Sequence, residues 1–323
     1  GVIGLSMAWE LIRRHHRVTV FDTGPMGRKA SWAGAGILSP ANHRTMTHPL
    51  DQLLGLGSEL HEAWAGRLQE ETGIDNGFRK CGGVYLARTP GERAALQGQM
   101  WHWREYGVEH EQIDSLAELK ADGIATPDQV LAVRVPGESQ ICNPDHLQAL
   151  MAACRKNGAV LNEHGGDVHL NSNADGVVSI STDSGNLAFD QVVVCAGVWS
   201  TRLLQPLDVD LPMIPVRGQI HLYKQPRLLV PHIINEGSRY IVPRDDGHVI
   251  VGSTTEEVGF DESTTEEKLA DLHDFANSIV PALEKSRLER SWAGLRPASH
   301  DGFPFLGRVA GFRNLLVATG HFK

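Results

Sequence analysis

The opening stretch of the chain, GVIGLSMAWELIRRHHRVTVFDTGP (residues 1–25), carries the pattern that decides the fold. Gly1 and Gly4 match the last two glycines of a Gly-x-Gly-x-x-Gly turn, and an apolar face over residues 4–15 predicts a helix after them. A short buried strand, RVTVF, then leads to Asp22, at roughly the 20-residue spacing of a carboxylate that binds a ribose hydroxyl. The stretch predicts half of a dinucleotide-binding βαβ unit, with a pyrophosphate at the helix N-terminus. The alternative is a glycine-rich helix start followed by a solvated aspartate.

Composition places the chain among ordinary globular proteins. Its 323 residues are 41% hydrophobic and 21% charged, with a formal net charge of −9. This charge argues against nucleic acid as a partner, and no apolar run approaches the roughly 20 residues of a membrane span. The four cysteines form no Cys-x-x-Cys pair, which favours a reducing compartment, so we expect a cytoplasmic protein. The 16 histidines show no metal-binding spacing, and no metal is predicted.

Three helices are indicated in the first half of the chain. Leucines and a tryptophan at helical spacing predict the first over residues 50–72. The second begins at Thr89, an N-cap followed by proline and by a glutamate three residues on. The third is expected over residues 143–158, with Asn143 as its cap.

The second half of the chain changes to alternating apolar and polar residues. The stretch MIPVRGQIHLYKQ and the stretch RYIVPRDDGHVIVGST predict strands, and the latter folds back at Asp246-Gly247. We therefore expect an α/β protein with a discontinuous, Rossmann-like dinucleotide-binding domain and an interleaved, mostly antiparallel β-sheet substrate domain. The expected division gives residues 1–80, 141–205 and 288–323 to the first domain and residues 81–140 and 206–287 to the second.

The ends of three predicted strands favour FAD over a nicotinamide dinucleotide. Ligands of an open parallel sheet lie at the carboxyl ends of its strands, and Phe21, Val194 and Val317 each precede a turn. The small residues of segment 28–40 can let a ring system lie on the backbone. A long crevice with several tight turns suits a whole FAD, although Ala-Gly turns are also ordinary strand exits.

Four blocks carry a resemblance to a known family: ASWAGAGILSP, VVVCAGVWS, SWAGLRPASHDGFPFLG and ATGHF, in this order. Together they resemble the D-amino-acid oxidase superfamily of flavoproteins, and within it the glycine oxidases of bacterial thiamine biosynthesis. The resemblance implies a glutathione-reductase-2-like fold and non-covalent FAD. It also implies oxidation of an amine next to a carboxylate to an imine, with O₂ reduced to hydrogen peroxide. Glycine would give glyoxylate and ammonia after hydrolysis.

The resemblance also implies which residues contact FAD. The phosphate turn is Gly1, Val2, Ile3 and Gly4, and the ribose contacts are Asp22 and Thr23. The segment along the pyrophosphate and flavin contains Ala30, Ser31, Ala35, Gly36 and Ile37. The adenine contact is Val168, the strand exit is Gly197, and the loop at the flavin ring contains His321 and Phe322.

Two residues match the family's substrate contacts. Arg296, in GLRP, matches the arginine that holds the substrate carboxylate, and a planar guanidinium can pair with a carboxylate through two hydrogen bonds. The alternative for Arg296 is a structural salt bridge. Tyr240 matches a tyrosine whose hydroxyl helps to bind the carboxylate, and its alternative is a tyrosine that packs in a sheet. No general base is required, because hydride can pass from a neutral amine's α-carbon to the flavin.

Two positions depart from the family pattern. Lys323 stands where glycine oxidases carry a second substrate-facing arginine, and it loses the planar fork. Thr255 stands where some members have a methionine that closes the pocket, so a different amine substituent could enter.

The family has a strand before Gly1 and a helix after the last loop, so we expect the chain to be truncated at both ends. Other readings remain open: a D-amino-acid dehydrogenase, a sarcosine-type oxidase, an NAD-dependent dehydrogenase or a non-catalytic nucleotide-binding module. The expected partners are a small amino acid or amine and O₂, and the sequence leaves open whether the protein forms a homo-oligomer.

Overall fold

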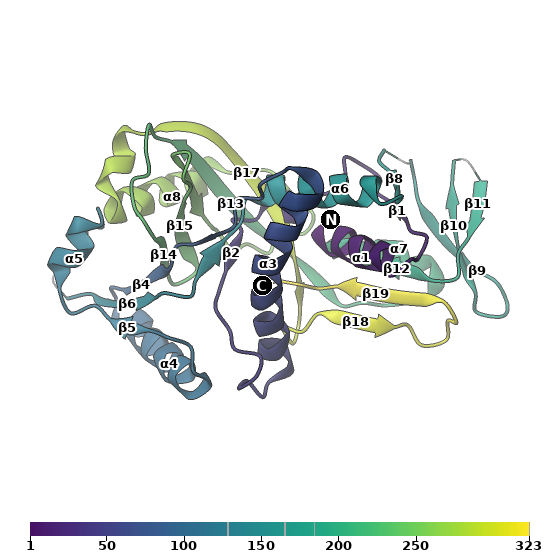
Figure 1. The fold of residues 1–323 in the computed structure, drawn as a ribbon, viewed down its shortest axis with the longest axis horizontal. Coiled ribbons are helices and arrows are strands. Elements are labelled where there is room, and N and C mark those ends of the chain that lie inside the picture. The colour runs from purple at the N-terminus through teal and green to yellow at the C-terminus, as the bar shows by residue number, and fades with distance from the viewer. Residues whose placement is uncertain (128, 165, 184, 323) are drawn as a thin grey trace.

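The computed structural model of the protein describes residues 1–127, 129–164, 166–183 and 185–322. The molecule is elongated, with two lobes side by side along its long axis (Figure 1). One lobe is built on a large sheet, and the other contains helix α1 and several short parallel strands. Helix α3 (Pro49–Thr72) lies where the two lobes meet.

The large sheet has eight strands in the order β17-β13-β16-β15-β14-β4-β6-β5. All neighbouring pairs are antiparallel except β14 and β4, which confirms the mostly antiparallel sheet. The strands are β4 (Gly83–Ala87), β5 (Glu111–Gln112), β6 (Leu131–Val135), β13 (Met213–Lys224), β14 (Ile233–Glu236), β15 (Arg239–Pro243), β16 (His248–Gly252) and β17 (Arg287–Ser299).

The two faces of this sheet have different partners because side chains alternate along each strand. Ile241 of β15 packs in one core cluster with Leu272 of helix α8 (Glu266–Ile279). Its neighbours Tyr240 and Val242 belong to a separate cluster that includes Ala35 from the other lobe. The face that carries Tyr240 is therefore turned toward the segment expected to run along the cofactor.

The second lobe contains the predicted βαβ half. Helix α1 (Val2–Arg13) is followed by β1 (Thr19–Phe21), which pairs in parallel with β8 (Val160–Asn162). Trp9 is fully buried, and α1 packs against helix α6 (Asn143–Lys156). A second group joins β12 (Val192–Val194) in parallel to β19 (Leu315–Thr319), with β18 (Phe305–Arg308) antiparallel at the edge.

Shorter elements complete the chain. Strands β2, β7 and β3 form one small sheet, and β9, β10 and β11 form a meander. The remaining elements are α2 (Ala30–Ala33), β2 (Ile37–Leu38), β3 (Arg79–Lys80), α4 (Pro90–Tyr106), α5 (Leu116–Ala121), β7 (Ser139–Gln140), β9 (His169–Ser172), β10 (Val178–Thr182), β11 (Gly185–Ala188), η1 (Gly197–Trp199), α7 (Ser200–Leu204), η2 (Gln205–Leu207) and η3 (Pro281–Lys285).

Local signals at element ends are confirmed with one exception. Thr89 and Glu92 form a complete capping box on α4. The β15–β16 hairpin turns at Gly247, whose φ of 87° favours glycine. The expected cap at Asn143 is wrong, because Cys142 occupies the N-cap and the Asn143 amide instead donates to the Ser31 carbonyl at 2.7 Å. That side chain therefore joins α6 to the cofactor segment rather than capping its own helix.

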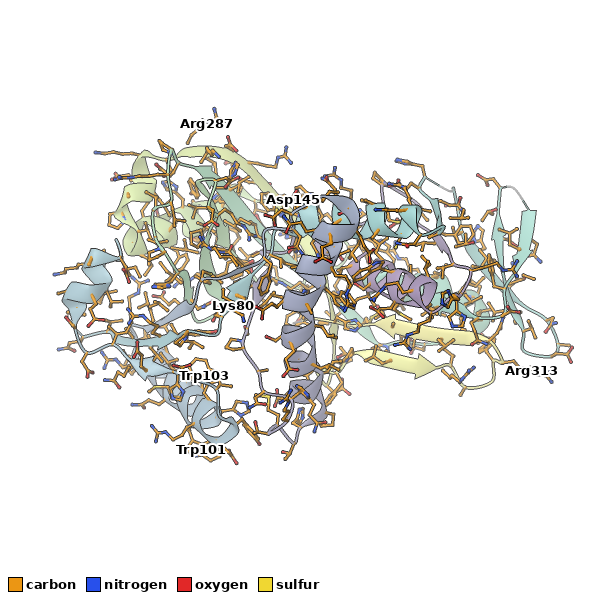
Figure 2. The ribbon with its side chains drawn as sticks, viewed as in Figure 1. Lys80, Trp101, Trp103, Asp145, Arg287 and Arg313 are labelled. Atoms are coloured by element: carbon orange, nitrogen blue, oxygen red, sulfur yellow. The ribbon has the colours of Figure 1, made fainter. Side chains whose placement is uncertain are left out.

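The five-segment division into domains stays a prediction. Its last boundary falls at the first residue of β17, which pairs with β13 in the large sheet. Figure 2 labels Arg287 at this outer end of β17. Within the described ranges, no helix is long and apolar enough to cross a membrane. The same ranges contain no cluster of three or more His, Cys, Asp or Glu side chains that could hold a metal ion.

Candidate functional site

Three segments expected to bind the cofactor meet at the N-terminus of α1. The Val2 amide donates to the Ser31 hydroxyl at 2.9 Å, and the Gly1 nitrogen lies 3.9 Å from a carboxylate oxygen of Asp22. Gly4 lies against the end of β12, where an added Cβ would sit 3.4 Å from the Cys195 Cβ. Gly1 at the N-cap has no side chain, and among the described residues Ser31 is the one side chain that accepts from the first turn of α1, so this helix end is suited to an anionic group.

The segment Ala35-Gly36-Ile37 is held by its carbonyl groups. The Ile141 amide donates to the Gly36 carbonyl at 2.9 Å, and the Arg244 guanidinium donates to the Ala35 carbonyl at 2.8 Å. Gly36 has a φ of 73°, and a Cβ there would overlap the Ile141 carbonyl oxygen. Only glycine fits this backbone, and the segment therefore packs directly against the Ile141 carbonyl.

The preceding residues, 30–34, pack on β17. The Trp292 indole donates to the Ala33 carbonyl at 3.0 Å. Gly294 allows this approach, because a Cβ at that position would lie 2.5 Å from the Ala33 Cβ. The close packing sets the distance between the segment expected to bind the cofactor and the strand that carries Arg296.

Arg296 and Tyr240 reach the same place from different strands. The Arg296 guanidinium donates to the Ser253 hydroxyl and to the Thr254 carbonyl, the latter at 3.3 and 3.4 Å. Burial raises the pKa of the Tyr240 hydroxyl, and hydrogen bonds with Ser253 and Arg296 partly offset that rise. The Arg296 guanidinium also lies 5.9 Å from the centre of the Phe322 ring.

Glycines make room for both side chains. A Cβ on Gly218, in the adjacent strand β13, would lie 2.7 Å from the Arg296 guanidinium carbon. A Cβ on Gly252 would lie 2.7 Å from the Tyr240 hydroxyl, because Gly252 stands directly opposite Tyr240 in the sheet. The guanidinium and the phenol therefore lie flat over neighbouring strands.

The acids near Arg296 are already paired with another arginine. Arg217, on β13, contacts Glu256 at 2.8 Å and Asp261 at 2.5 Å. These contacts and its hydrogen bonds lower the pKa of Glu256 to about 2, against the opposing effect of its burial. Among the described residues, Arg296 has no carboxylate partner, so the salt-bridge alternative finds no support.

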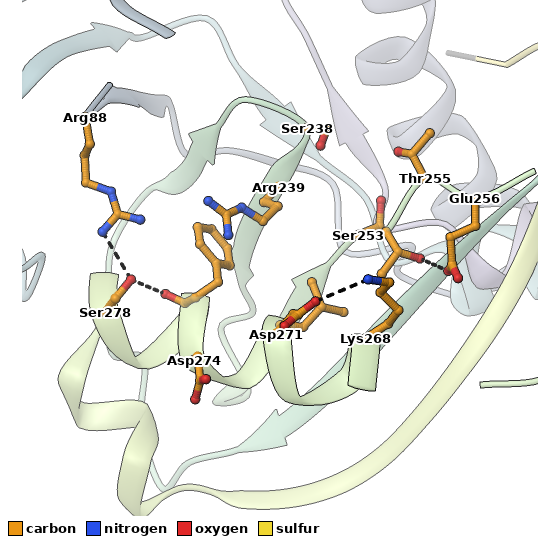
Figure 3. A pocket seen from close by; sticks show the side chains of 13 residues that line it. Arg88, Ser238, Arg239, Ser253, Thr255, Glu256, Lys268, Asp271, Asp274 and Ser278 are labelled. Carbon is orange, nitrogen blue, oxygen red and sulfur yellow. Dashed lines mark hydrogen bonds and ion pairs between the residues drawn. The ribbon is translucent and has the colours of Figure 1, made fainter. Parts of the chain in front are cut away.

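A cavity of about 620 Å³ lies beside Ser253 and Thr254, the two residues that hold the Arg296 guanidinium. Figure 3 shows it between Ser253, Thr255 and Glu256 on one side and helix α8 on the other, where Lys268 pairs with Asp271 at 3.5 Å. Thr255 is exposed and lines this cavity. Its wall carries charges of both signs, which distinguishes it from the Arg296 site.

The other expected cofactor residues lie at strand ends. Gly197 begins η1 with a φ of 55°, and its carbonyl accepts a bond from Thr319 of β19 at 2.9 Å. Burial lowers the pKa of His321, which follows that strand together with Phe322. Thr23 and Val168 lie after β1 and before β9. Lys323 is outside the described residues.

The structure also brings in residues that sequence patterns did not indicate. Ser253 and Thr254 anchor Arg296, and Arg217 pairs with the neighbouring acids. Arg244 and Asn143 hold the segment expected to bind the cofactor. These roles depend on contacts between distant strands, which a single sequence does not display.

The comparisons with known proteins agree with this geometry. A family model described as "FAD dependent oxidoreductase" (DAO) matches residues 1–323. The chain is 35% identical to a glycine oxidase of Pseudomonas aeruginosa, over 100% of this chain and 88% of that protein. A crystal structure of glycine oxidase from Geobacillus kaustophilus superposes with a TM-score of 0.92 at 31% identity, covering 100% of this chain and 87% of the other. The bifunctional protein ThiO/ThiG of Trichormus variabilis is 29% identical, and the match covers 49% of its length.

Proposed function

The chain belongs to the family of FAD-dependent oxidoreductases, and we propose that it oxidises glycine or a similarly small amino acid or amine to an imine. The observation that carries the substrate class is Arg296. Its guanidinium is partly buried, is held within the described part of the chain by neutral oxygen atoms only, and lies beside the Tyr240 hydroxyl. A substrate carboxylate supplies the negative charge that no described side chain gives it. The relatives named glycine oxidase support the choice of a small substrate.

The residues present fit FAD. The N-terminus of α1, where the N-cap residue Gly1 has no side chain, suits the pyrophosphate, and Asp22 beside Gly1 suits the ribose. Buried Asn143 Oδ1 has no hydrogen-bond partner among the described residues, and FAD offers hydroxyl and ring N–H donors. When bound, FAD supplies the two-electron oxidation.

The side chains of this protein orient the substrate. Arg296 and Tyr240 fix the carboxylate, which places the α-carbon on the side of the Phe322 loop and the Ala35-Gly36-Ile37 segment. A neutral amine loses hydride from the α-carbon and a proton from nitrogen, which leaves the imine. Water then converts the glycine imine to glyoxylate and ammonia. We propose that O₂ takes the two electrons, together with the two protons that the amine has lost, and becomes hydrogen peroxide.

We infer a place for this reaction in the assembly of the thiamine thiazole, in the cytoplasm. The inference rests on the resemblance to the thiamine-pathway enzymes and on the match to half of ThiO/ThiG. Cys81, Cys142, Cys154 and Cys195 are all unpaired, which suits a reducing compartment.

A substrate screen tests the proposal. The FAD-loaded protein is mixed with glycine, sarcosine or D-alanine, and peroxide, ammonia and dye reduction are measured in parallel. Peroxide formed with glycine supports the proposal. Dye reduction without peroxide indicates a dehydrogenase, and bound FAD without turnover of any amine indicates a non-catalytic nucleotide-binding module.

A further inference from the structure

A second arginine without a carboxylate partner lies outside the substrate site. Arg244 follows Pro243 at the end of β15, and its guanidinium donates to the Gln140 side-chain oxygen at 2.6 Å and to the Ala35 carbonyl at 2.8 Å. It forms no ion pair with any described residue. The two aspartates that follow it in the hairpin are engaged elsewhere, Asp245 with Arg79 and Asp246 with His248.

Gln140 fixes the direction of this guanidinium. It is 1% exposed, and its amide nitrogen donates to the Pro243 carbonyl at 2.8 Å and to the Cys81 sulfur at 3.3 Å. Because both donors are used, the amide oxygen is directed at Arg244. Gln140 also pairs with Ile37 between β7 and β2. The Arg244–Gln140 pair thus connects the large sheet to the segment expected to bind the cofactor.

The tie affects which backbone groups of that segment remain available. The Ala35 carbonyl is taken by Arg244 and the Gly36 carbonyl by Ile141. The Gly36 amide, which shares a peptide unit with the Ala35 carbonyl, has no acceptor among the described residues. The N–H and C=O of one peptide unit point in opposite directions, so holding the Ala35 carbonyl at Arg244 turns the Gly36 amide away from Arg244.

The charge also needs an explanation. Burial lowers the pKa of the Arg244 guanidinium, since desolvation penalises a cation. A buried charge normally requires a paired opposite charge, and among the described side chains Arg244 has only the attraction of Asp246, which is itself paired with His248. FAD carries two phosphate charges, and its ring gains negative charge on reduction.

We propose that Arg244 is a positioning residue for FAD: it aims the Gly36 amide at the cofactor and supplies a positive charge that favours the reduced form. This inference rests on the proposed function, because it requires that FAD lies along residues 35–37. It adds a role for an arginine that does not contact the substrate carboxylate.

Three variants distinguish the effect of the Arg244 hydrogen bonds on the position of the segment from the effect of the Arg244 charge. Arg244→Met removes both, Arg244→Lys keeps the charge but loses the two-pronged contact, and Gln140→Glu keeps an acceptor while neutralising the charge. Arg79→Met is the matched control, because Arg79 contacts Pro243 and Asp245 of the same hairpin but not residues 35–37. The FAD dissociation constant is measured by flavin fluorescence, and the midpoint potential by dye equilibration.

We expect the FAD dissociation constant to rise at least tenfold in Arg244→Met and several-fold in Arg244→Lys. The midpoint potential should fall in Arg244→Met and Gln140→Glu and change little in Arg244→Lys and Arg79→Met. If Arg244→Met does not fold, the results for Arg244→Lys and Gln140→Glu test the inference. Wild-type affinity and potential in all three variants overturn the inference. A wild-type protein that binds no FAD overturns the proposed function instead.

Discussion

Replacing Arg296 with methionine removes the charge while keeping most of the side-chain length. The variant should bind FAD normally, because the contacts of Arg296 are with Ser253 and the Thr254 carbonyl rather than with the phosphate turn. The substrate carboxylate would then enter a partly buried site without a cation. The loss should therefore appear in substrate binding rather than in cofactor binding.

The magnitude follows from the geometry. Leaving one partner of a buried, hydrogen-bonded charge pair unmatched costs about 2–5 kcal/mol. At about 1.4 kcal/mol per factor of ten, kcat/KM for glycine should fall by roughly 30-fold to several thousand-fold. Arg296→Lys keeps the charge but loses one of two hydrogen bonds, which costs about 1.5–3 kcal/mol. It should therefore lie between the wild type and the methionine variant.

The assay is steady-state peroxide formation over a range of glycine concentrations, with visible absorbance to measure bound flavin. Arg287→Met is the matched control, because Arg287 lies on the same strand, is exposed and, among the described residues, pairs only with Glu289. Wild-type kinetics in Arg296→Met, with flavin bound, would refute the assignment of the carboxylate to Arg296.

Three further substitutions test the space around Arg296, the buried carboxyl of Glu138 and the role of Lys323. Gly218→Ala should displace the Arg296 guanidinium, because the new Cβ would lie 2.7 Å from its central carbon, and we expect a higher KM for glycine with little change in melting temperature. Burial raises the pKa of Glu138 to about 7, so the folded state holds this proton more tightly than the unfolded chain. The wild type should therefore lose on the order of 3 kcal/mol of stability between about pH 4.5 and pH 7.5, and urea titrations of Glu138→Gln should not show this loss. Lys323→Arg should lower the KM for glycine or narrow the range of amines oxidised, and an unchanged substrate profile would argue against a substrate contact.

Local patterns predicted much of the fold. The apolar face after Gly4 predicted a helix, observed as α1, and Asp246-Gly247 predicted the β15–β16 hairpin. These features depend on residues close together in the chain. The prediction of Asn143 as a helix cap was wrong, because its side-chain amide donates to the Ser31 carbonyl, 112 residues away in the chain.

The site was predictable only in part. Arg296 and Tyr240 could be proposed from motifs, and the structure brings them together through Ser253. The pairing of Glu256 with Arg217, which leaves Arg296 without an acid, depends on strand register and could not be read from the sequence. Gly218 gave no signal either, since its role appears only when the neighbouring strand is in place.

Oxidation of glycine by the bound FAD is tested most directly by anaerobic mixing of the FAD-loaded protein with glycine. The visible absorbance of the oxidised flavin is recorded during the mixing. We expect glycine to bleach this absorbance, with a rate that saturates as glycine increases, and Arg296→Met to require far more glycine for the same rate. Flavin that stays bound and oxidised with glycine, sarcosine and D-alanine alike would contradict it.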